Sequence, residues 1–465
     1  MMILSTLRIS PWYVLISLWI LLFSSSCSPA PKIMPPQIYS QEPSEIVPTG
    51  PPKDKSQISE LVSTAEIQPE VSLGFTYQQA NGNRTIPGKG FLPSGTAMEV
   101  NLPGKPSWIV GAVHQNKPLW SVVLEDGSVL FYLITEKGVI EKQVPEMQLP
   151  AGMPPMLSSF PDQYQLVTVE DREKSVLTHP VYLLRTDQIA YITQSGRLKI
   201  VKRDGQLTAS LDINALPDAR IIVDEYDRLL VLSDPTTAYN HGVLGDNLEA
   251  TSMTLIETIL GPRVVTQIKM PPHEVIEGIS PIWEDLDGDG QREIIATIST
   301  IDLGAGIVIF DESGERLAEG DKIGRTFRWR HQIGLIPSGP GENSELIVVR
   351  TPHIGGVVEY YQYSEGNLQI SADFPGITSH VLGSRNLDLA VLGDFDGDNA
   401  IELLTPSPDL TELIAVRRND SGAEEAWRLS FSGKLSTNLS GVTLPNGKIS
   451  LAAGREDGFL MVWLP

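Results

Sequence analysis

Two nine-residue segments of the chain carry carboxylates at the same four positions. Residues 285–293 read DLDGDGQRE and residues 394–402 read DFDGDNAIE, with acids at positions 1, 3, 5 and 9. Alternating side chains of a tightly wound loop can point toward one centre. Calcium prefers six to eight oxygen ligands at about 2.3–2.6 Å. The spacing therefore predicts two calcium sites.

The expected ligands of each site are the four carboxylates and the backbone carbonyl of position 7. These positions are Asp285, Asp287, Asp289, Gln291 and Glu293 in one loop, and Asp394, Asp396, Asp398, Ala400 and Glu402 in the other. Gly288 and Gly397 permit the turn, because glycine adopts a positive φ without strain. Since all ligands come from one short loop, a structural role for the ion is favoured over a catalytic one. The alternative is an acidic hairpin solvated by water.

The two loops resemble those of the FG-GAP and VCBS repeats, the family that includes the propeller of the integrin α-subunit. The resemblance covers both loops and the strands that follow them. It implies a β-propeller in which each loop joins the first strand of a blade to the second. A third segment, 337–345, aligns with the same nine positions but has no carboxylate at positions 1, 3 and 5. We expect it to keep the backbone plan without the metal.

The strands that would position these loops recur as a hairpin. Each copy has an apolar strand, a polar or glycine-bearing loop, a second apolar strand and a turn. The seven copies start at Leu119, Ile189, Leu229, Glu293, Glu345, Glu402 and Ile449. The pattern predicts an all-β chain, a seven-bladed β-propeller of four-stranded antiparallel blades. An open stack of hairpins or two β-sandwiches are the alternatives.

The two ends of this repeated region complement each other. The last copy stops after its third strand, whereas residues 97–103 have the character of a fourth strand and precede the first copy. We expect 97–103 to pair with 458–463 and to close the ring, which removes exposed strand edges.

Histidines gather on one predicted face of the propeller. His241 and His353 fall in loops between second and third strands, and His331 falls near a connection between blades. With Arg350, they form the candidate ligand face, opposite the calcium loops, because histidine binds metals and exchanges protons near neutral pH. The alternative is that loops carry polar residues anyway.

The N-terminus has the pattern of an export signal. Residues 12–23 are apolar except for Ser17, residues 24–26 are serines, and Cys27 is the only cysteine of the chain. The segment resembles a bacterial lipoprotein signal, which implies lipidation of Cys27 and a membrane anchor; ordinary signal cleavage without a lipid is the alternative. We expect a signal peptide (1–26), a proline-rich tether (27–59), an unassigned lead-in (60–96) and the propeller (97–465).

The composition narrows the function. A formal net charge of −22 over 465 residues argues against nucleic acid as a partner and suits a protein that holds cations. No phosphate-binding loop, G-x-S-x-G elbow or H-E-x-x-H motif is present in the sequence. We expect an exported, lipid-anchored calcium-binding module that recognises a glycan or a protein at the cell envelope. The alternatives are a polysaccharide lyase or hydrolase with its site opposite the calcium loops, and a structural or assembly role.

Overall fold

The computed structural model of the chain describes residues 71–143, 147–336, 344–364 and 366–465, all within one compact unit. The described residues form strands and turns, and they contain no helix long and apolar enough to cross a membrane. The predicted signal peptide, Cys27, the tether and the first part of the lead-in lie outside the described residues.

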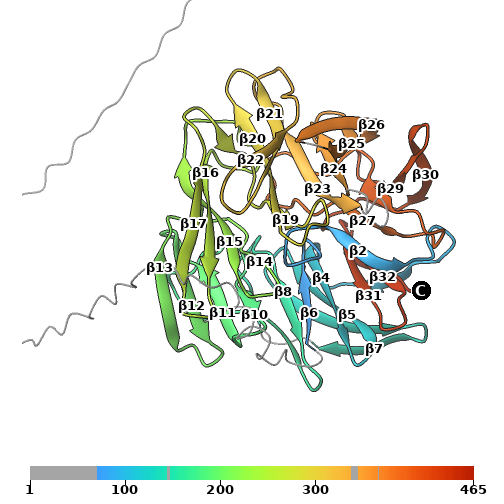
Figure 1. The fold of residues 1–465 in the computed structure, drawn as a ribbon. Coiled ribbons are helices and arrows are strands. Elements are labelled where there is room, and N and C mark those ends of the chain that lie inside the picture. Colours follow the sequence, from blue (N-terminus) through green and yellow to red (C-terminus); the bar gives the residue numbers. More distant parts are fainter. Residues whose placement is uncertain (1–70, 144–146, 337–343, 365) are drawn as a thin grey trace, which may run out of the picture. The chain divides into compact units, whose positions relative to one another are not determined.

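Most strands belong to four-stranded antiparallel groups that follow one another along the chain (Figure 1). The first group consists of β4 (Pro106–His114), β5 (Lys117–Leu124), β6 (Val129–Thr135) and β7 (Gly138–Gln143), and the second of β10 (Val181–Leu183), β11 (Gln188–Ile192), β12 (Arg197–Lys202) and β13 (Leu207–Asp212). The third group consists of β14 (Ile222–Val223), β15 (Leu229–Thr236), β16 (Glu249–Glu257) and β17 (Arg263–Lys269). The fourth consists of β19 (Ile282–Glu284), β20 (Glu293–Thr300), β21 (Gly304–Phe310) and β22 (Arg316–Glu319). The short β18 (Val275–Ile276) joins the third group to the fourth.

The remaining three four-stranded groups complete the series. Their strands are β23 (Arg330–Ile336), β24 (Glu345–Arg350), β25 (Gly356–Ser364) and β26 (Asn367–Ile377); β27 (Val391–Asp394), β28 (Glu402–Pro406), β29 (Glu412–Asn419) and β30 (Gly422–Ser430); and β31 (Ser440–Thr443), β32 (Ile449–Arg455), β33 (Phe459–Trp463) and β3 (Met98–Asn101). The seven predicted hairpins are the second and third strands of these seven groups.

The last group is completed from the beginning of the described chain. β3 pairs antiparallel with β33, with Met98 opposite Val462 and Asn101 opposite Phe459. This is the pairing that the sequence predicts for 97–103 and 458–463. β31 also lies beside β4, so the last group and the first are neighbours (Figure 1).

The predicted number of seven groups is not confirmed. The described residues contain an eighth, three-stranded sheet of β1 (Ser72–Phe75), β8 (Met156–Ser159) and β9 (Tyr164–Leu166), in the order β1-β8-β9. Its strands have only four, four and three residues. Strands so short show no clear alternation of apolar and polar residues, and β1 comes from a distant part of the chain. For these reasons the hairpin pattern in the sequence did not predict this sheet.

Residues 72–89, here called the inner segment, contact the first strands of successive groups. The carbonyls of Ala80 and Asn81 accept hydrogen bonds from Val223 in β14 (2.9 Å) and Trp283 in β19 (2.9 Å). Within the inner segment, β2 (Thr85–Lys89) runs parallel to β27. Four-stranded antiparallel sheets whose first strands face one common centre are the architecture of a β-propeller. Residues 72–89, a part of the lead-in that the sequence left unassigned, thus lie at the centre of the fold.

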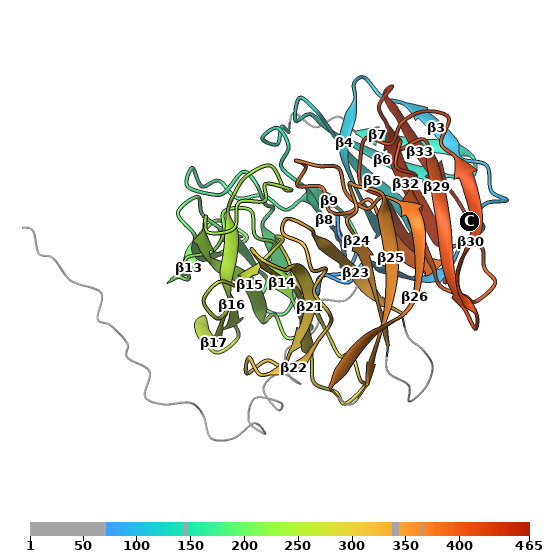
Figure 2. The ribbon, with the colours of Figure 1, turned by 90° about the horizontal axis from the view of Figure 1, so that it is seen from above.

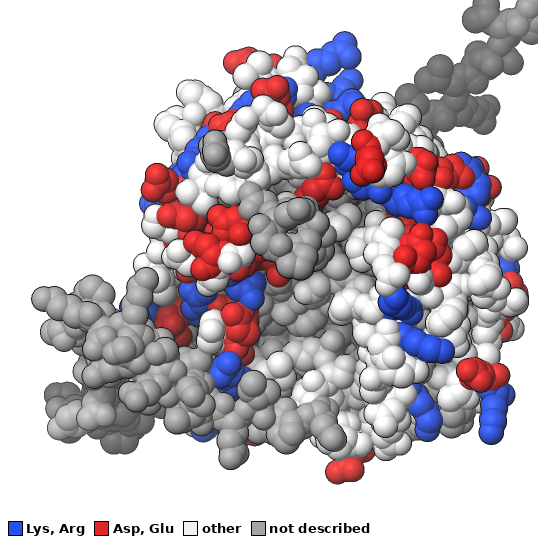
Figure 3. All heavy atoms as spheres, turned by 45° about the vertical axis from the view of Figure 1, so that its right-hand side comes forward, with Lys and Arg blue, Asp and Glu red and all other residues white. Residues whose placement is uncertain are grey.

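The apolar core lies in layers between neighbouring sheets. One layer joins β5 and β6 to β33 through Trp120, Tyr132, Leu460 and Val462, all at most 1% exposed. Figure 2 shows the sheets side by side from above. On the outer surface, acidic and basic side chains lie among one another over the face in Figure 3.

Candidate functional site

Each predicted calcium loop joins the first strand of a group to the second. Residues 285–293 connect β19 to β20, and residues 394–402 connect β27 to β28. Glu293 and Glu402, at position 9, are the first residues of the second strands, so their side chains are fixed by the sheet. Loops that follow the first strand and loops that precede it lie at opposite ends of that strand.

The loop 394–402 gathers its carboxylates around one point. Asp394 accepts hydrogen bonds from the backbone N–H groups of Gly397 (2.7 Å) and Asn399 (3.1 Å). Ligand oxygens of Asp394, Asp396 and Glu402 lie within 4.8 Å of one another. Asp398 differs, because it pairs with Arg417 at 3.1 Å.

Glu402 is the most constrained carboxylate of this loop. One oxygen, Oε2, accepts the N–H of Phe395 at 2.8 Å, whereas Oε1 is buried without a hydrogen-bond partner in the described structure. Burial, reinforced by the charges of Asp396 and Asp398, raises the pKa of Glu402 to about 8. A buried oxygen that lacks a donor is costly, and a divalent cation would satisfy it.

The loop 285–293 follows the same plan with more exposure. Asp285 accepts the N–H groups of Gly288 (2.7 Å) and Gly290 (2.9 Å). Oxygens of Asp285, Asp287 and Asp289 lie within 4.8 Å of one another. Glu293 accepts the N–H of Leu286 at 2.7 Å, and burial raises its pKa to about 7.

At position 6, different residues of the two loops adopt the same positive φ. Gly290 has φ 84° and Asn399 has φ 75°. Asparagine is one of the few residues that tolerate this conformation. The third aligned segment, 337–345, lies outside the described residues except for its last two positions.

Two of the four residues proposed for the histidine face, His241 and His353, lie near each other. Nδ1 of His241 lies 2.5 Å from Glu277, and the ring of His241 is 6.4 Å from that of His353. His331 is set apart, because its ring stacks on Trp329 at 5.0 Å. Arg350 is not part of this group: it bonds Glu359 at 2.6 Å within its own sheet. Arg350 remains a prediction for the ligand face, although a carboxylate of its own sheet already holds its guanidinium.

Two residues beside His241 and His353 were not among the leading candidates from the sequence. His380 lies 5.9 Å from His353, measured between ring centroids. Glu277 holds His241 and also accepts a hydrogen bond from Ser299. A lone carboxylate in the apolar run VIEGISPIW was the available signal for Glu277. His380 carried none, because its proximity to His353 depends on how two loops pack.

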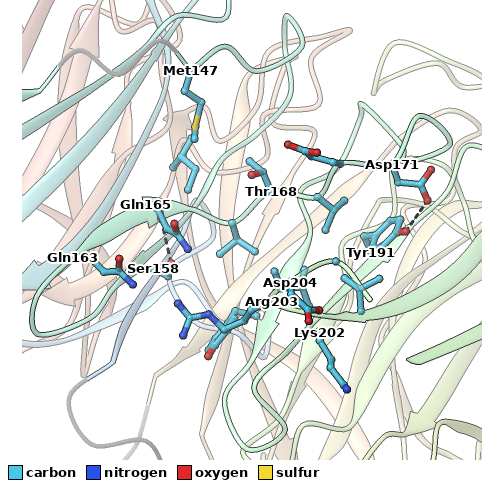
Figure 4. Close-up of a pocket in the computed structure, with 18 of the residues that line it drawn as sticks. Met147, Ser158, Gln163, Gln165, Thr168, Asp171, Tyr191, Lys202, Arg203 and Asp204 are labelled. Carbon is cyan, nitrogen blue, oxygen red and sulfur yellow. Dashed lines mark hydrogen bonds between the residues drawn. The ribbon is translucent and has the colours of Figure 1, made fainter. Parts of the chain in front are cut away.

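A cavity of about 920 Å³ lies between the sheet β1-β8-β9 and the group β10–β13 (Figure 4). It is lined by aromatic, apolar and charged side chains, among them Phe160, Gln165, Asp171, Tyr191, Val201 and Arg203. The three-stranded sheet is too small to cover the outer parts of β11 and β12, and this leaves the space. A cavity produced by a missing strand has no sequence motif, so it could not be predicted.

Side chains of the cavity are held in place by one another. The hydroxyl of Tyr191 donates to Asp171 at 2.6 Å, and Lys199 pairs with the same carboxylate at 2.9 Å. The guanidinium of Arg203 lies 4.7 Å from the ring of Phe160. The walls thus offer both flat ring faces and charged hydrogen-bonding groups.

A smaller depression of about 310 Å³ lies at the ends of the first strands that face away from the calcium loops. It is lined by residues that precede or begin first strands: Ser107, Trp108, Gly152, Leu177, Arg385 and Ser436. Arg385 is already paired with Asp218 at 2.9 Å and with Asp246 at 2.5 Å. The one charged side chain among the residues that line this depression is therefore already paired.

Comparison with known proteins identifies no family. No family model matches the chain, and no curated protein matches it. Among solved structures, the computationally designed Ika8 protein superposes with a TM-score of 0.44 and 9% identity, over 78% of this chain and 98% of that one. BamB from Moraxella catarrhalis superposes with a TM-score of 0.45 and 13% identity, over 80% of this chain and 97% of that one.

Proposed function

We propose that the chain is a calcium-binding β-propeller that acts as an exported, lipid-anchored recognition module at the cell envelope. The anchor is the lipidated Cys27, and the ligand is a glycan or a protein. In this proposal the propeller is closed by β3, and the sheet β1-β8-β9 is an additional, shortened blade.

The observation that supports calcium is the buried, unpartnered Oε1 of Glu402 beside Asp394 and Asp396. Oxygen-only ligands from carboxylates suit calcium better than a softer metal. The ion would tie the end of β27 to the start of β28. The loop 285–293, with the same spacing, would do so for β19 and β20.

The observation that supports recognition is the cavity between β1-β8-β9 and β10–β13. Its volume of about 920 Å³ lies within the range of about 300–1,000 Å³ that is usual for ligand sites. Ring faces such as Phe160 and charged groups such as Arg203 and Asp171 suit a ligand with both flat and hydroxylated or amide surfaces. We therefore place the recognition site in this cavity rather than on the histidine face.

The contact between His241 and Glu277 favours the second candidate function, a polysaccharide lyase or hydrolase. An imidazole held by a buried carboxylate is a common arrangement of a general base. His241 lies on the face opposite the calcium loops, where such a site would have to be.

The test is binding of the calcium-loaded full chain to an array of immobilised bacterial polysaccharides and peptides, with product release measured in parallel. R203A and Q165A, in the cavity, should each weaken binding at least several-fold. The matched control is R197A, since Arg197 lies at the other end of β12 and pairs with the exposed Asp212. Equal binding by R203A, Q165A and R197A, or no binding at all, would overturn the recognition site. Turnover that is lost in H241Q would establish the enzyme instead.

A further inference from the structure

We propose that His241, His353 and His380 form a binding site for a divalent transition metal ion of the zinc type. The three residues lie in three loops: between β15 and β16, between β24 and β25, and between β26 and β27. This site is separate from the calcium loops, and it does not depend on the proposed recognition function.

The first argument is the protonation of His380. Its Nε2 lies 2.7 Å from the carbonyl oxygen of Ser384. A carbonyl only accepts hydrogen bonds, so Nε2 carries the proton and donates it. Nδ1 is then a bare lone pair, and in the described structure this buried atom has no hydrogen-bond partner.

His241 is oriented in a corresponding way. Its Nδ1 contacts the buried carboxylate of Glu277, which also receives the hydroxyl of Ser299. With its proton on Nδ1, His241 presents Nε2 as the free donor atom. A metal-binding histidine usually donates its other N–H to a carboxylate or a backbone carbonyl. In this structure His241 contacts a carboxylate and His380 donates to a backbone carbonyl.

His353 stands between these two residues. Its ring centroid is 6.4 Å from that of His241 and 5.9 Å from that of His380, and the rings are inclined by 57° and 75°. Inclined rings at this separation can turn their edges toward one point. Nδ1 of His353 is buried without a hydrogen-bond partner among the described residues.

Binding requires the three imidazoles to move closer together. Zinc–nitrogen bonds are about 2.0–2.1 Å long. The three imidazoles are not among the described groups whose donor atoms all lie within 4.8 Å of one another. They must therefore rotate toward the ion. His353 is partly exposed and lies next to the exposed Ile354, so it can turn and the ion can reach it.

Aromatic side chains pack against two of the three imidazoles. Phe327 stacks on His241 at 5.4 Å, and Trp329 packs edge-on against His380 at 5.1 Å. The carboxylate of Glu277 supplies negative charge behind His241. Three imidazoles with a carboxylate in the outer shell are typical of zinc sites that keep one ligand position open.

The experiment measures metal binding to the full chain in excess calcium, which keeps the acidic loops occupied. Equilibrium dialysis with zinc should give one ion per chain, and cobalt(II) should give the visible absorption bands of a nitrogen-ligated site. H353Q, at a partly exposed position, should abolish both signals without unfolding the protein. E277Q should weaken zinc binding by about 10–100-fold.

The control is H273N. His273 is exposed and has φ 75°, which asparagine tolerates. This variant should bind zinc like the unchanged chain. The proposal is wrong if no zinc binds in excess calcium, or if H353Q and H241Q retain the stoichiometry and the cobalt spectrum.

Discussion

Arg84 and Asp388 form a salt bridge of 2.9 Å in which neither side chain is more than 3% exposed. Arg220 binds the same carboxylate at 2.6 Å. Burial alone would raise the pKa of Asp388, but the charges of Arg220 and Arg84 outweigh it and hold that pKa below its usual value. Arg84 belongs to the inner segment, so this one carboxylate fixes the inner segment to two of the surrounding groups.

Replacing that carboxylate should strongly destabilise the fold. D388N leaves two buried guanidiniums without a counter-charge, and removing one partner of a buried ion pair costs about 3–5 kcal/mol. Urea unfolding followed by fluorescence measures the change. D212N is the control, because Asp212 is 72% exposed and pairs with Arg197 at the surface, where a pair contributes about 0–1 kcal/mol. Equal effects of the two substitutions would contradict the assigned role of Asp388.

Stability should fall between about pH 6.5 and pH 4 through His179. Burial, aided by the charge of Arg220, lowers the pKa of His179 from 6.5 to about 4. In this window the unfolded chain binds a proton that the folded chain does not, so stability rises with pH and is lost as pH falls. H179Q should reduce the slope of unfolding free energy against pH without abolishing it, because burial also lowers the pKa of His331, His353 and His380. H273N should not, because His273 is exposed; an unchanged slope in H179Q would refute the assignment.

Chelation should lower the melting temperature, and calcium should restore it. At a calcium concentration about 100-fold above Kd, one site stabilises the fold by about 2.7 kcal/mol. E402Q should remove the contribution of the loop 394–402, as measured by calorimetry with and without chelator. E315Q, an exposed carboxylate in the turn between β21 and β22, should respond to calcium like the unchanged chain. A melting temperature that is the same with and without chelator would exclude both calcium sites.

A single methyl group should displace the inner segment. A Cβ at Gly74 would lie 2.1 Å from the carbonyl oxygen of Gly111 in β4. G74A should therefore destabilise the protein by about 1–3 kcal/mol, which is typical of overpacking. At Gly95 a Cβ would meet only the carbonyl of Phe91, at 3.5 Å. G95A should be close to neutral in thermal unfolding, and a neutral G74A would show that the segment is not tightly packed.

The sequence revealed features that depend on local pattern. Hairpins such as the one that starts at Leu119 are visible because apolar strands and glycine turns alternate along the chain. The pairing of β3 with β33 could be predicted because the last hairpin copy lacked a fourth strand. Residues 97–103 had the character of such a strand but preceded the first copy. The convergence of Asp394, Asp396 and Glu402 follows from spacing within nine residues.

Features that depend on packing between distant segments were not visible. The sequence does not show that Glu359 holds both Arg330 and Arg350, because their contact depends on the register of neighbouring strands. Nor does it show that His380 joins His353, since the two lie in separate loops. The inner segment has no repeat of its own, and its role depends entirely on the strands around it.

The inner segment has a consequence for how the chain folds. Gln78 donates a hydrogen bond to the carbonyl of Leu439, 361 residues away. Likewise, β3 near the start of the described chain pairs with β33 near its end. Contacts between residues so far apart form slowly, because the entropy of closing a long loop is lost before the contacts stabilise the chain. Neither contact can form before the region around residues 439–463 is present and folded. We therefore expect residues 76–101 to dock last, and to detach first when the C-terminal strands are removed.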